Sequence, residues 1–468
     1  MTTLANAIIN KQRDVVRDYI LRGGPVNEID EYGFTPLIES AITNDFEMAK
    51  ILLDGGADVL MPDLVGGTAL HWAVENENMP LARLLLEKGA DPNAANFNGE
   101  PVYVKPLLRN QPDLKLLLNQ YGARIDFATD FINAKLIGHR YDLRGSCDII
   151  SPHGHFVEVG FEGFFLEFSL GLVRFSLEQY AKNYNARSMR KRFDVLHSCI
   201  KALRSAEQLI FYQHYQQDVA AHRTVIDALM QEELLILPCN FEGHAIVFIV
   251  YEHWLIRCDR RKIDQALNGI CVFSMRHPGN LTPSLMRRII FEKKTKSFVD
   301  EYLTDYLGLR LAVRLVISPQ VSGNCSWANV VSVLPAVDYL LTELVGKKKP
   351  PILGEPLLVD HMHHSIQLYQ HWRDWDRLRM LDYFVQAFEF RDKKRRASIV
   401  SLLAAVIFQR FSAKDPQVVE VARPIIKILQ HPDYHYVLDA YLNQYYRQSR
   451  TPAGENLFAL IHESDSFI

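Results

Sequence analysis

The stretch Thr68-Ala-Leu-His-Trp-Ala73 belongs to a pattern that returns every 33 residues in the first part of the chain. Thr35-Pro-Leu37 stands 33 residues before it, and the turns Gly56-Ala-Asp58 and Gly89-Ala-Asp91 keep the same period. Apolar residues at helical spacing, as in Leu81-Ala-Arg-Leu-Leu-Leu86, fill the intervals. Such a period predicts a repeat protein in which each unit buries its apolar face against the next unit.

These units resemble the ankyrin repeat, in which Thr-Pro-Leu-His-x-Ala opens the first helix and Gly-Ala-Asp forms a turn. We predict about four repeats over residues 1–126, the first from Leu4 to Asn27 and a degenerate last one from Pro101 to Ile125. The resemblance implies a protein partner that is bound on the concave face and at the fingertips of the loops. The candidate partner-binding residues at these fingertips are Tyr32, Phe34, Leu64, Val65, Phe97 and Asn98.

Composition limits the classes of function that remain. The chain has 468 residues, enough for about three domains, and is 48% hydrophobic and 23% charged, as soluble globular proteins are. A net charge of −3 favours neither direct nucleic-acid binding nor an acidic membrane surface. The N-terminus lacks a Sec signal, and we find no apolar run of the roughly 18 residues that a membrane span needs. Six scattered cysteines suit reduced thiols.

A second informative stretch is Ser318-Pro-Gln-Val-Ser-Gly-Asn-Cys-Ser-Trp-Ala-Asn329. Cys325 follows a Ser-Gly-Asn turn and opens an apolar run that suits a buried helix, with Pro335 as a possible kink. The positive end of a helix favours the thiolate, so Cys325 is the candidate nucleophile. The alternative interpretation is a small buried hydrophobic residue. Cys239 follows a proline and opens no helix, which makes it a weaker candidate.

The segment from Gly243 to Asp259 predicts a hairpin that turns near Glu252. If the turn centres between residues 251 and 252, paired residue numbers sum to 503, and His244 then faces Asp259 directly. A carboxylate in that place can hold an imidazole. Gln320, five residues before the candidate nucleophile, could donate a hydrogen bond to an oxyanion, although an ordinary loop glutamine is the alternative.

The order His244, Asp259, Gln320, Cys325 resembles the ubiquitin-like-protease clan of cysteine peptidases over residues 140–345. This clan includes the SUMO proteases, the adenovirus protease and YopJ-type effectors. The resemblance implies a papain-like α+β domain with Cys325 as nucleophile, His244 as general base, Asp259 as orienting acid and Gln320 as oxyanion donor. No metal or cofactor is required. The sequence departs from the clan at Ala245, where tryptophan often stands, and at Ser326, where glycine is common.

Three functions stay open on these residues. The first is a thiol hydrolase that cleaves a peptide or isopeptide bond. The second is an acyltransferase on the same triad, with a coenzyme A donor whose phosphates would need a basic pocket. The third is a catalytically silent adaptor in which the ankyrin repeats bind a protein and the protease-like fold only docks. The candidate residues for the basic pocket are Arg257, Arg260, Arg261 and Lys262.

The predicted architecture is a multidomain α+β protein with an N-terminal ankyrin solenoid. A cysteine-protease-like domain occupies residues 127–345, with a β-rich start over 127–180 and a helical insertion over 260–310. A Pro- and Lys-rich linker at 346–356 leads to an all-helical domain over 357–468. His361-Met-His-His364 looks like a set of metal ligands, but no carboxylate or cysteine at ligand spacing accompanies it. We therefore interpret it as a solvated helix start and predict no metal site.

The tail from Gly454 to Ile468 resembles the translocation signals of type IV secretion effectors, and the domain order resembles the ankyrin effectors of Legionella. These resemblances imply delivery into the cytoplasm of a host cell and a host protein partner. They also imply entry into the host nucleus, where the partner would be a component of the transcription machinery or a nuclear ribonucleoprotein. The basic run from Asp392 to Arg396 fits a nuclear-import signal or an ordinary loop between helices.

Overall fold

The computed structural model describes residues 4–96, 100–109, 111–143, 146–150, 156–160, 166–215, 222–261, 269–321, 324–346, 357–391 and 393–465. Its contacts divide the chain into two compact units, Met1–Lys135 and Leu136–Ile468. The helix α9 (Ile125–Arg140) runs across this division. The predicted borders at residues 126, 345 and 356 stay predictions, and all of the predicted linker 346–356 except its first residue lies outside the described residues.

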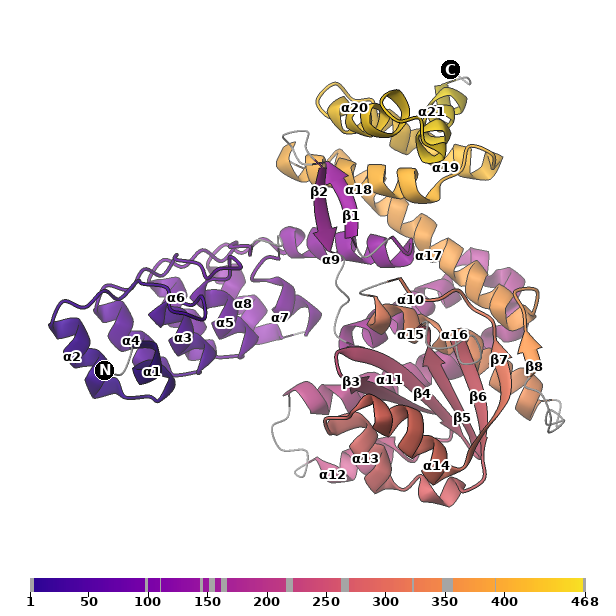
Figure 1. The fold of residues 1–468 in the computed structure, drawn as a ribbon, viewed down its shortest axis with the longest axis horizontal. Coiled ribbons are helices and arrows are strands. Elements are labelled where there is room, and N and C mark those ends of the chain that lie inside the picture. Colours follow the sequence, from indigo (N-terminus) through magenta and orange to yellow (C-terminus); the bar gives the residue numbers. More distant parts are fainter. Residues whose placement is uncertain are drawn as a thin grey trace. The chain divides into compact units, whose positions relative to one another are not determined.

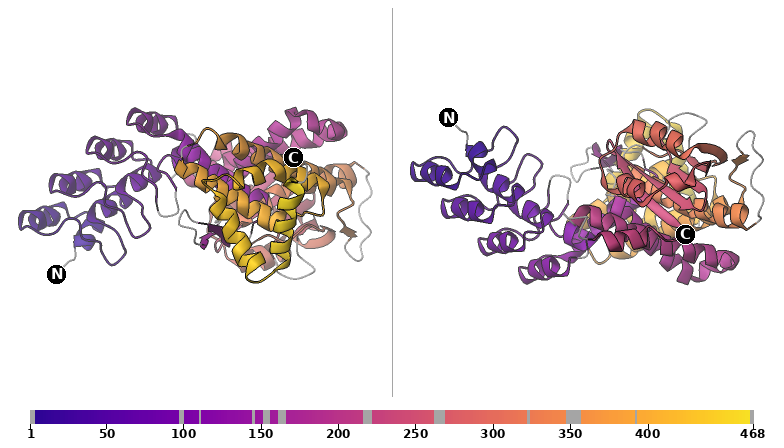
Figure 2. Two further views of the ribbon diagram at one scale, coloured as in Figure 1. Left: turned by 90° about the horizontal axis from the view of Figure 1, so that it is seen from above. Right: turned by 90° about the horizontal axis from the view of Figure 1, so that it is seen from below.

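The first unit is built from helix pairs that stack in a row (Figures 1 and 2). Each pair ends in a glycine with a positive φ, from +78° at Gly23 to +93° at Gly89, a conformation that other residues adopt only with strain. This requirement explains the 33-residue return of the glycine turn. The pairs are α1 (Leu4–Ile9) with α2 (Arg13–Leu21), α3 (Pro36–Ile42) with α4 (Phe46–Asp54), α5 (Ala69–Glu75) with α6 (Met79–Glu87), and α7 (Val104–Leu108) with α8 (Pro112–Gln120).

The threonines of the repeat begin helices, as the motif predicts. Thr35 precedes α3, and its hydroxyl accepts a hydrogen bond from the backbone N–H of Ile38 over 3.2 Å. Thr68 precedes α5, and its backbone N–H donates to Nδ1 of His71 over 3.1 Å. These caps satisfy N–H groups that the first helical turn leaves unpaired. The apolar faces between the helices are buried, and Leu52 and Leu85 are fully so.

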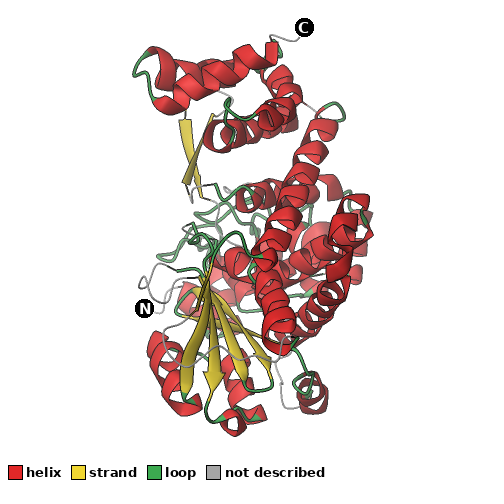
Figure 3. Cartoon of the chain, turned by 90° about the vertical axis from the view of Figure 1, so that its right-hand side faces the viewer, coloured by secondary structure: helices red, strands yellow, loops and turns green. Residues whose placement is uncertain are grey.

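The second unit contains a six-stranded sheet in the order β3-β4-β5-β6-β7-β8. Neighbouring strands are antiparallel except for β7 and β8, which are parallel. Figure 3 shows the sheet as a twisted fan among helices. The strands are β3 (Leu235–Phe241), β4 (His244–Tyr251), β5 (Trp254–Asp259), β6 (Gly269–Met275), β7 (Leu309–Leu315) and β8 (Leu357–Val359), and a separate hairpin joins β1 (Ser146–Ile150) to β2 (Phe156–Gly160).

Both faces of the sheet are covered, so its central strands are apolar along nearly their whole length. One face packs on α12, α13, η3 and α14, and Leu237, Phe248 and Leu285 belong to this core. Helices α15 and α16 pack against β4 and β5. The described helices between β2 and β8 are α10 (Leu166–Lys182), η1 (Tyr184–Arg192), α11 (Phe193–Tyr215), α12 (Arg223–Leu229), η2 (Pro278–Asn280), α13 (Pro283–Phe291), η3 (Phe298–Tyr302), α14 (Leu303–Leu307), α15 (Cys325–Val331), α16 (Val333–Tyr339) and η4 (Leu340–Val345).

The segment Cys325–Val345 is, by length and composition alone, the one described helix that could cross a membrane. Its mean hydropathy is 1.4, but 78% of its apolar window is buried inside the protein. This corrects our expectation that no segment is long and apolar enough, and the burial identifies a core helix of the second unit. A break after Val331 precedes Pro335, whose missing N–H cannot continue the helical ladder.

After β8 the described chain is helical, as predicted for residues 357–468 apart from that short strand. The prediction of a β-rich segment over 127–180 is wrong at both ends, because α9 and α10 are helices that flank the β1–β2 hairpin. Within the segment 260–310, the β-rich run Ile270–Met275 predicts a strand and lies in β6 of the central sheet, and the helices of the predicted insertion follow it. The C-terminal elements are α17 (His364–Phe388), α18 (Lys393–Arg410), α19 (Pro416–Leu429), α20 (His435–Leu442), η5 (Asn443–Arg447) and α21 (Pro452–Asp465).

Candidate active site

His244 and Asp259 lie on neighbouring antiparallel strands, where the predicted hairpin is found. The predicted register is wrong by two residues: Tyr251 pairs with Trp254, so paired numbers sum to 505. The turn is Glu252-His253, and Glu252 adopts a left-handed φ of +49°. A shift of two keeps both side chains on one face of the sheet, as diagonal neighbours. His244 Nε2 accordingly lies 3.1 Å from Asp259 Oδ1.

Two arginines and a second carboxylate surround Asp259, which is 1% exposed. Arg257 Nη2 and Arg261 Nη2 each lie 2.7 Å from Asp259 Oδ2. Both arginines also form ion pairs with Asp300 on η3. Asp300 Oδ1 lies 2.5 Å from Arg257 Nη2 and 3.2 Å from Arg261 Nη2. Burial alone would raise the pKa of Asp259, but the hydrogen bond from His244 and the two guanidinium charges together hold the pKa far below its ordinary value. Asp259 is therefore ionised at neutral pH.

Cys325 is the first residue of α15 and is partly buried beside His244. Burial opposes ionisation of its thiol, but hydrogen bonding with His244 and with the backbone at Ala245 outweighs burial and lowers the pKa below the ordinary 9.0. Burial likewise opposes protonation of His244, but Asp259 and Cys325 raise the pKa of the imidazole above 6.5. Since Nε2 faces Asp259, Nδ1 is the ring nitrogen left for the thiol. Charge separation between thiol and imidazole is thus favoured.

Four other cysteines have a pKa that burial raises rather than lowers. Cys239, the weaker candidate nucleophile, is fully buried, and burial raises the pKa of its thiol to about 12. Burial also raises the pKa of Cys271 to about 11, and the pKa values of Cys199 and Cys258 are raised as well. Of Cys325 and these four cysteines, only Cys325 has a lowered pKa.

Gln320 lies in the loop between β7 and α15, where its backbone N–H donates to the carbonyl oxygen of Arg260 over 2.9 Å. This bond fixes the loop beside the end of the strand that carries Asp259. The Oε1 atom of Gln320 is buried and makes no hydrogen bond with any described residue. The backbone of Gln320 is thus anchored beside the end of β5, and the role of its side-chain amide as oxyanion donor stays a prediction.

Asn329 and Arg260 hold the site together, and the sequence analysis assigned neither of them this role. Asn329 Nδ2 donates to the carbonyl oxygen of Ala245 over 2.7 Å, and Asn329 Oδ1 accepts from the backbone N–H of Arg260 over 2.8 Å. Arg260 is 1% exposed and donates from Nε to the carbonyl oxygen of Ser318 over 2.7 Å. Two buried side chains therefore connect α15, β4, β5 and the loop that carries Gln320 by hydrogen bonds.

Sequence patterns could have indicated some of these residues. Arg257 and Arg261 stand two residues before and after Asp259, which places all three on one side of an extended chain. Asn329 stands four residues after Cys325, one helical turn along the same face. Asp300 offers no such signal, because a distant helix brings it to the strand.

The basic pocket suggested for coenzyme A is not available in this form. Arg260 is buried and bonded to Ser318 and Ala328. Arg257 and Arg261 are occupied by two carboxylates. Lys262 lies outside the described residues. The described arginines therefore bind Asp259, Asp300 and the Gln320 loop, and they do not line a phosphate pocket.

The candidate partner-binding residues of the first unit differ in exposure. Tyr32, Leu64 and Val65 are 60%, 69% and 59% exposed, as expected of fingertips. Phe34 is different, because its ring packs edge-on against Trp72 with centroids 5.9 Å apart, so it supports the repeat. Phe97 and Asn98 lie outside the described residues.

Aspartates fix the shape of these fingertips. Asp63 Oδ1 accepts hydrogen bonds from the backbone N–H groups of Val65 and Gly67 over 2.9 and 2.7 Å. Asp30 Oδ1 accepts in the same way from Tyr32 and Phe34. The loops therefore present their apolar side chains on a preformed backbone.

Comparison with known proteins identifies the class first. The family model for ankyrin repeats matches residues 4–96. The ankyrin repeat and SAM domain-containing protein 6 of Rattus norvegicus is 35% identical over 93 residues, which are 20% of this chain and 10% of that protein. The nuclear factor NF-kappa-B p105 subunit of Gallus gallus is 32% identical over 136 residues, with 21% of this chain and 14% of that protein covered. The chain spans at most 39% of the first curated relatives that it matches. The protein is an ankyrin-repeat protein.

A solved structure extends the similarity to the whole chain. The structure of the Legionella effector AnkH matches with a TM-score of 0.73 and 36% sequence identity, over 99% of this chain and 98% of that chain. The chain therefore belongs to the family of the Legionella effector AnkH.

Proposed function

We propose that this protein is an effector that binds host proteins through its ankyrin repeats and cleaves a peptide or isopeptide bond with the thiol of Cys325. The observation that carries the catalytic part is the imidazole of His244, which interacts with an ionised carboxylate 3.1 Å away and with a thiol of lowered pKa. That arrangement is the working form of a cysteine nucleophile with its base and orienting acid.

The chemistry follows from these positions. His244 takes the proton of Cys325, and the thiolate sulfur attacks the carbonyl carbon of the substrate. The backbone N–H of Cys325 and the side-chain amide of Gln320 stabilise the oxyanion. His244 then returns the proton to the leaving amine as the carbon–nitrogen bond breaks, and water hydrolyses the resulting thioester. Asp259 keeps the imidazole in the tautomer with a proton on Nε2.

Labelling with an electrophilic thiol probe tests the site in the full chain. We expect one modified residue, Cys325, near neutral pH, and slower labelling after His244→Ala. The variant His253→Ala, an exposed histidine of the same hairpin, is the matched control and should label like the wild type. Hydrolysis of a ubiquitin-like substrate should be lost in Cys325→Ala without loss of fold. No selective reaction at Cys325, or equal hydrolysis by the Cys325→Ala variant, would refute the hydrolase.

A catalytically silent adaptor is the second candidate, and the exposed fingertips favour it. In that case the paired substitution Tyr32→Ala and Val65→Ala should abolish capture of a host protein, whereas Cys325→Ala should leave every measured effect on the host cell unchanged. Each of the two exposed substitutions should change the free energy of unfolding by less than about 0.5 kcal/mol.

The similarity to a Legionella effector supports delivery into host cells. Delivery by a type IV system, entry into the nucleus and a partner in the transcription machinery or a nuclear ribonucleoprotein belong to the same proposal. The basic run that would direct nuclear import is described only in part, because residue 392 lies outside the described residues. A reporter fused to the full chain, followed in infected cells with and without a type IV system, tests delivery.

A further inference from the structure

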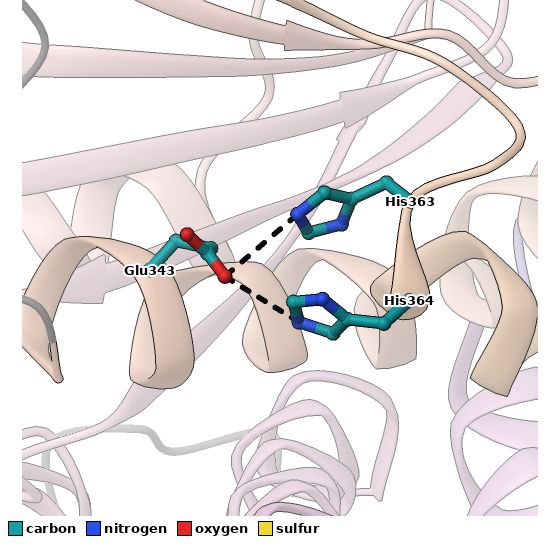
Figure 4. A group of neighbouring side chains, drawn as sticks. All are labelled: Glu343, His363 and His364. Atoms are coloured by element: carbon teal, nitrogen blue, oxygen red, sulfur yellow. Dashed lines mark ion pairs between the residues drawn. The ribbon is translucent and has the colours of Figure 1, made fainter.

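A second cluster of chemically active side chains lies at the other end of the helix that Cys325 begins. Glu343 belongs to η4, and His363 and His364 stand at the start of α17. One ligand atom from each of the three residues lies within 4.8 Å of the others. Figure 4 shows the carboxylate of Glu343 directed at both imidazoles. We propose that these three residues bind a divalent transition-metal ion of the zinc type.

The distances come close to what such an ion needs. Glu343 Oε1 lies 3.8 Å from His363 Nε2 and 3.7 Å from His364 Nε2. Around a tetrahedral zinc ion with bonds of about 2.0–2.1 Å, ligand atoms lie about 3.4 Å apart. The two distances from Glu343 to the imidazoles therefore exceed this separation by a few tenths of an ångström, and all three ligand atoms lie within 4.8 Å of one another. Two imidazole nitrogens and one carboxylate oxygen suit zinc, cobalt or nickel, whereas calcium and magnesium prefer oxygen ligands throughout.

Asp338 supplies an independent observation that points to a cation. It is 0% exposed, and its Oδ2 makes no hydrogen bond within 3.5 Å to any described residue. That oxygen lies 3.9 Å from His364 Nε2, at the border of the cluster, while Oδ1 accepts from Arg192 over 3.2 Å. A bound dication would balance the negative charges of Asp338 and Glu343, and the distance from Asp338 Oδ2 to His364 places Asp338 to become a fourth ligand.

The present contacts of the histidines show which bonds the ion would replace. His363 is the N-cap of α17, and its Nδ1 accepts from the backbone N–H of Ser365 over 3.2 Å. His364 Nε2 lies 3.1 Å from the hydroxyl of Thr342. Coordination through Nε2 moves the proton of each neutral ring to Nδ1, so the Ser365 bond is lost. The loss of one cap is small beside the free energy of a structural zinc site.

The consequence for the fold is a cross-link. The ion would join η4, which continues the buried helix from Cys325, to α17, the first long helix of the C-terminal part. The proposal does not depend on any activity at Cys325. The alternative is a hydrogen-bonded pair of histidines that takes up no metal.

The test measures Zn²⁺ binding to the full chain in the Cys325→Ala background, which removes a competing thiol. We expect uptake of one Zn²⁺ per chain by calorimetry, visible d–d absorption with Co²⁺, and a Zn²⁺-dependent rise of Tm. His363→Asn removes the imidazole but keeps an N-cap acceptor, and Glu343→Gln keeps the shape of the side chain. Each should weaken Zn²⁺ binding by at least about 100-fold. His361→Ala, an exposed histidine two residues away, is the matched control and should bind as the parent does.

Two outcomes would overturn the proposal. The first is no stoichiometric uptake of Zn²⁺ or Co²⁺ by the folded parent protein. The second is undiminished uptake by both His363→Asn and Glu343→Gln, since the ion would then be bound elsewhere. Circular dichroism of each variant without metal establishes that a loss of binding is not a loss of fold.

Discussion

Asn329 Nδ2 donates a 2.7 Å hydrogen bond to the carbonyl oxygen of Ala245, the residue that follows His244. The same amide accepts a bond through Oδ1 from the backbone N–H of Arg260, the residue that follows Asp259. A single buried side chain, one helical turn after Cys325, therefore ties the helix of the candidate nucleophile to both strands of its partners. The geometry of the site depends on this amide as much as on the three side chains themselves.

Replacing Asn329 by leucine should loosen both the fold and the site. Two buried backbone groups lose their partner, which should lower the free energy of unfolding by about 2–4 kcal/mol. Denaturant unfolding measures this loss, and alkylation of Cys325 at neutral pH should slow in the same variant. Asn443→Leu, at an exposed asparagine, is the control and should stay within about 0.5 kcal/mol of the wild type. An unchanged stability in Asn329→Leu would show that the two hydrogen bonds of Asn329 do not hold the helix to the strands.

The rate of alkylation of Cys325 should rise with pH, and the midpoint of this rise should lie at a lower pH than that of an ordinary thiol. Burial opposes its ionisation, but the hydrogen bond with His244 and the backbone groups lower the pKa below 9.0. His244→Ala removes that bond, so the curve should move to higher pH and the rate at neutral pH should fall. Mass spectrometry of the modified peptide after short exposures gives the rate. A curve that does not move in His244→Ala would show that the imidazole does not act on the thiol.

Asp259→Asn should destabilise the protein at neutral pH and lose this effect in acid. The folded-state pKa of Asp259 lies far below its unfolded value of about 3.9, so its ionised form stabilises the fold above that pH. This contribution disappears as pH falls through the folded-state pKa. At pH 7 the variant should be less stable by roughly 3 kcal/mol, because Arg257 and Arg261 lose a buried partner. Denaturant unfolding at several pH values should show the two proteins converging below about pH 4.

The exposed Asp305→Asn is the control for that experiment, and its stability should follow the wild type at every pH. A difference between wild type and Asp259→Asn that stays constant from pH 7 into acid would contradict the assignment of an ionised Asp259.

Glu39 in the ankyrin unit should have the opposite pH dependence. It is 5% exposed, and burial, together with the nearby charge of Asp30, raises its pKa to about 7. Stability from protonated Glu39 is complete below its unfolded pKa of about 4.3 and is lost as pH rises through 7. Glu39→Gln keeps an N–H that can donate to Asp30 and removes the charge.

The Glu39→Gln variant should therefore match the wild type near pH 4 and exceed it above pH 8 by on the order of 2 kcal/mol. Thermal unfolding across this range measures the difference. Glu47→Gln, at an exposed glutamate of the next helix, is the control. Equal stability of Glu39→Gln and wild type above pH 8 would show that Glu39 is not held protonated.

The repeats could be predicted from the sequence because their signals are local. A threonine cap, an apolar helical stripe and a glycine with positive φ each act within a few residues, so they recur visibly in the chain. The hairpin was predicted for the same reason. Its register was not, because the two-residue turn at Glu252 and His253 fixes the pairing, and alternation with period two fits several registers equally.

Contacts between distant segments required the folded chain. Asp300 reaches Arg257 and Arg261 only because η3 packs against the sheet. His363 and His364 stand about twenty residues from Glu343, outside any ligand spacing, and two helices bring them together. The sequence established the repeat class and nominated Cys325, His244 and Asp259, because residue type and order are local properties. The tertiary structure alone decided which charges surround them and which side chains converge, because long-range packing sets those distances.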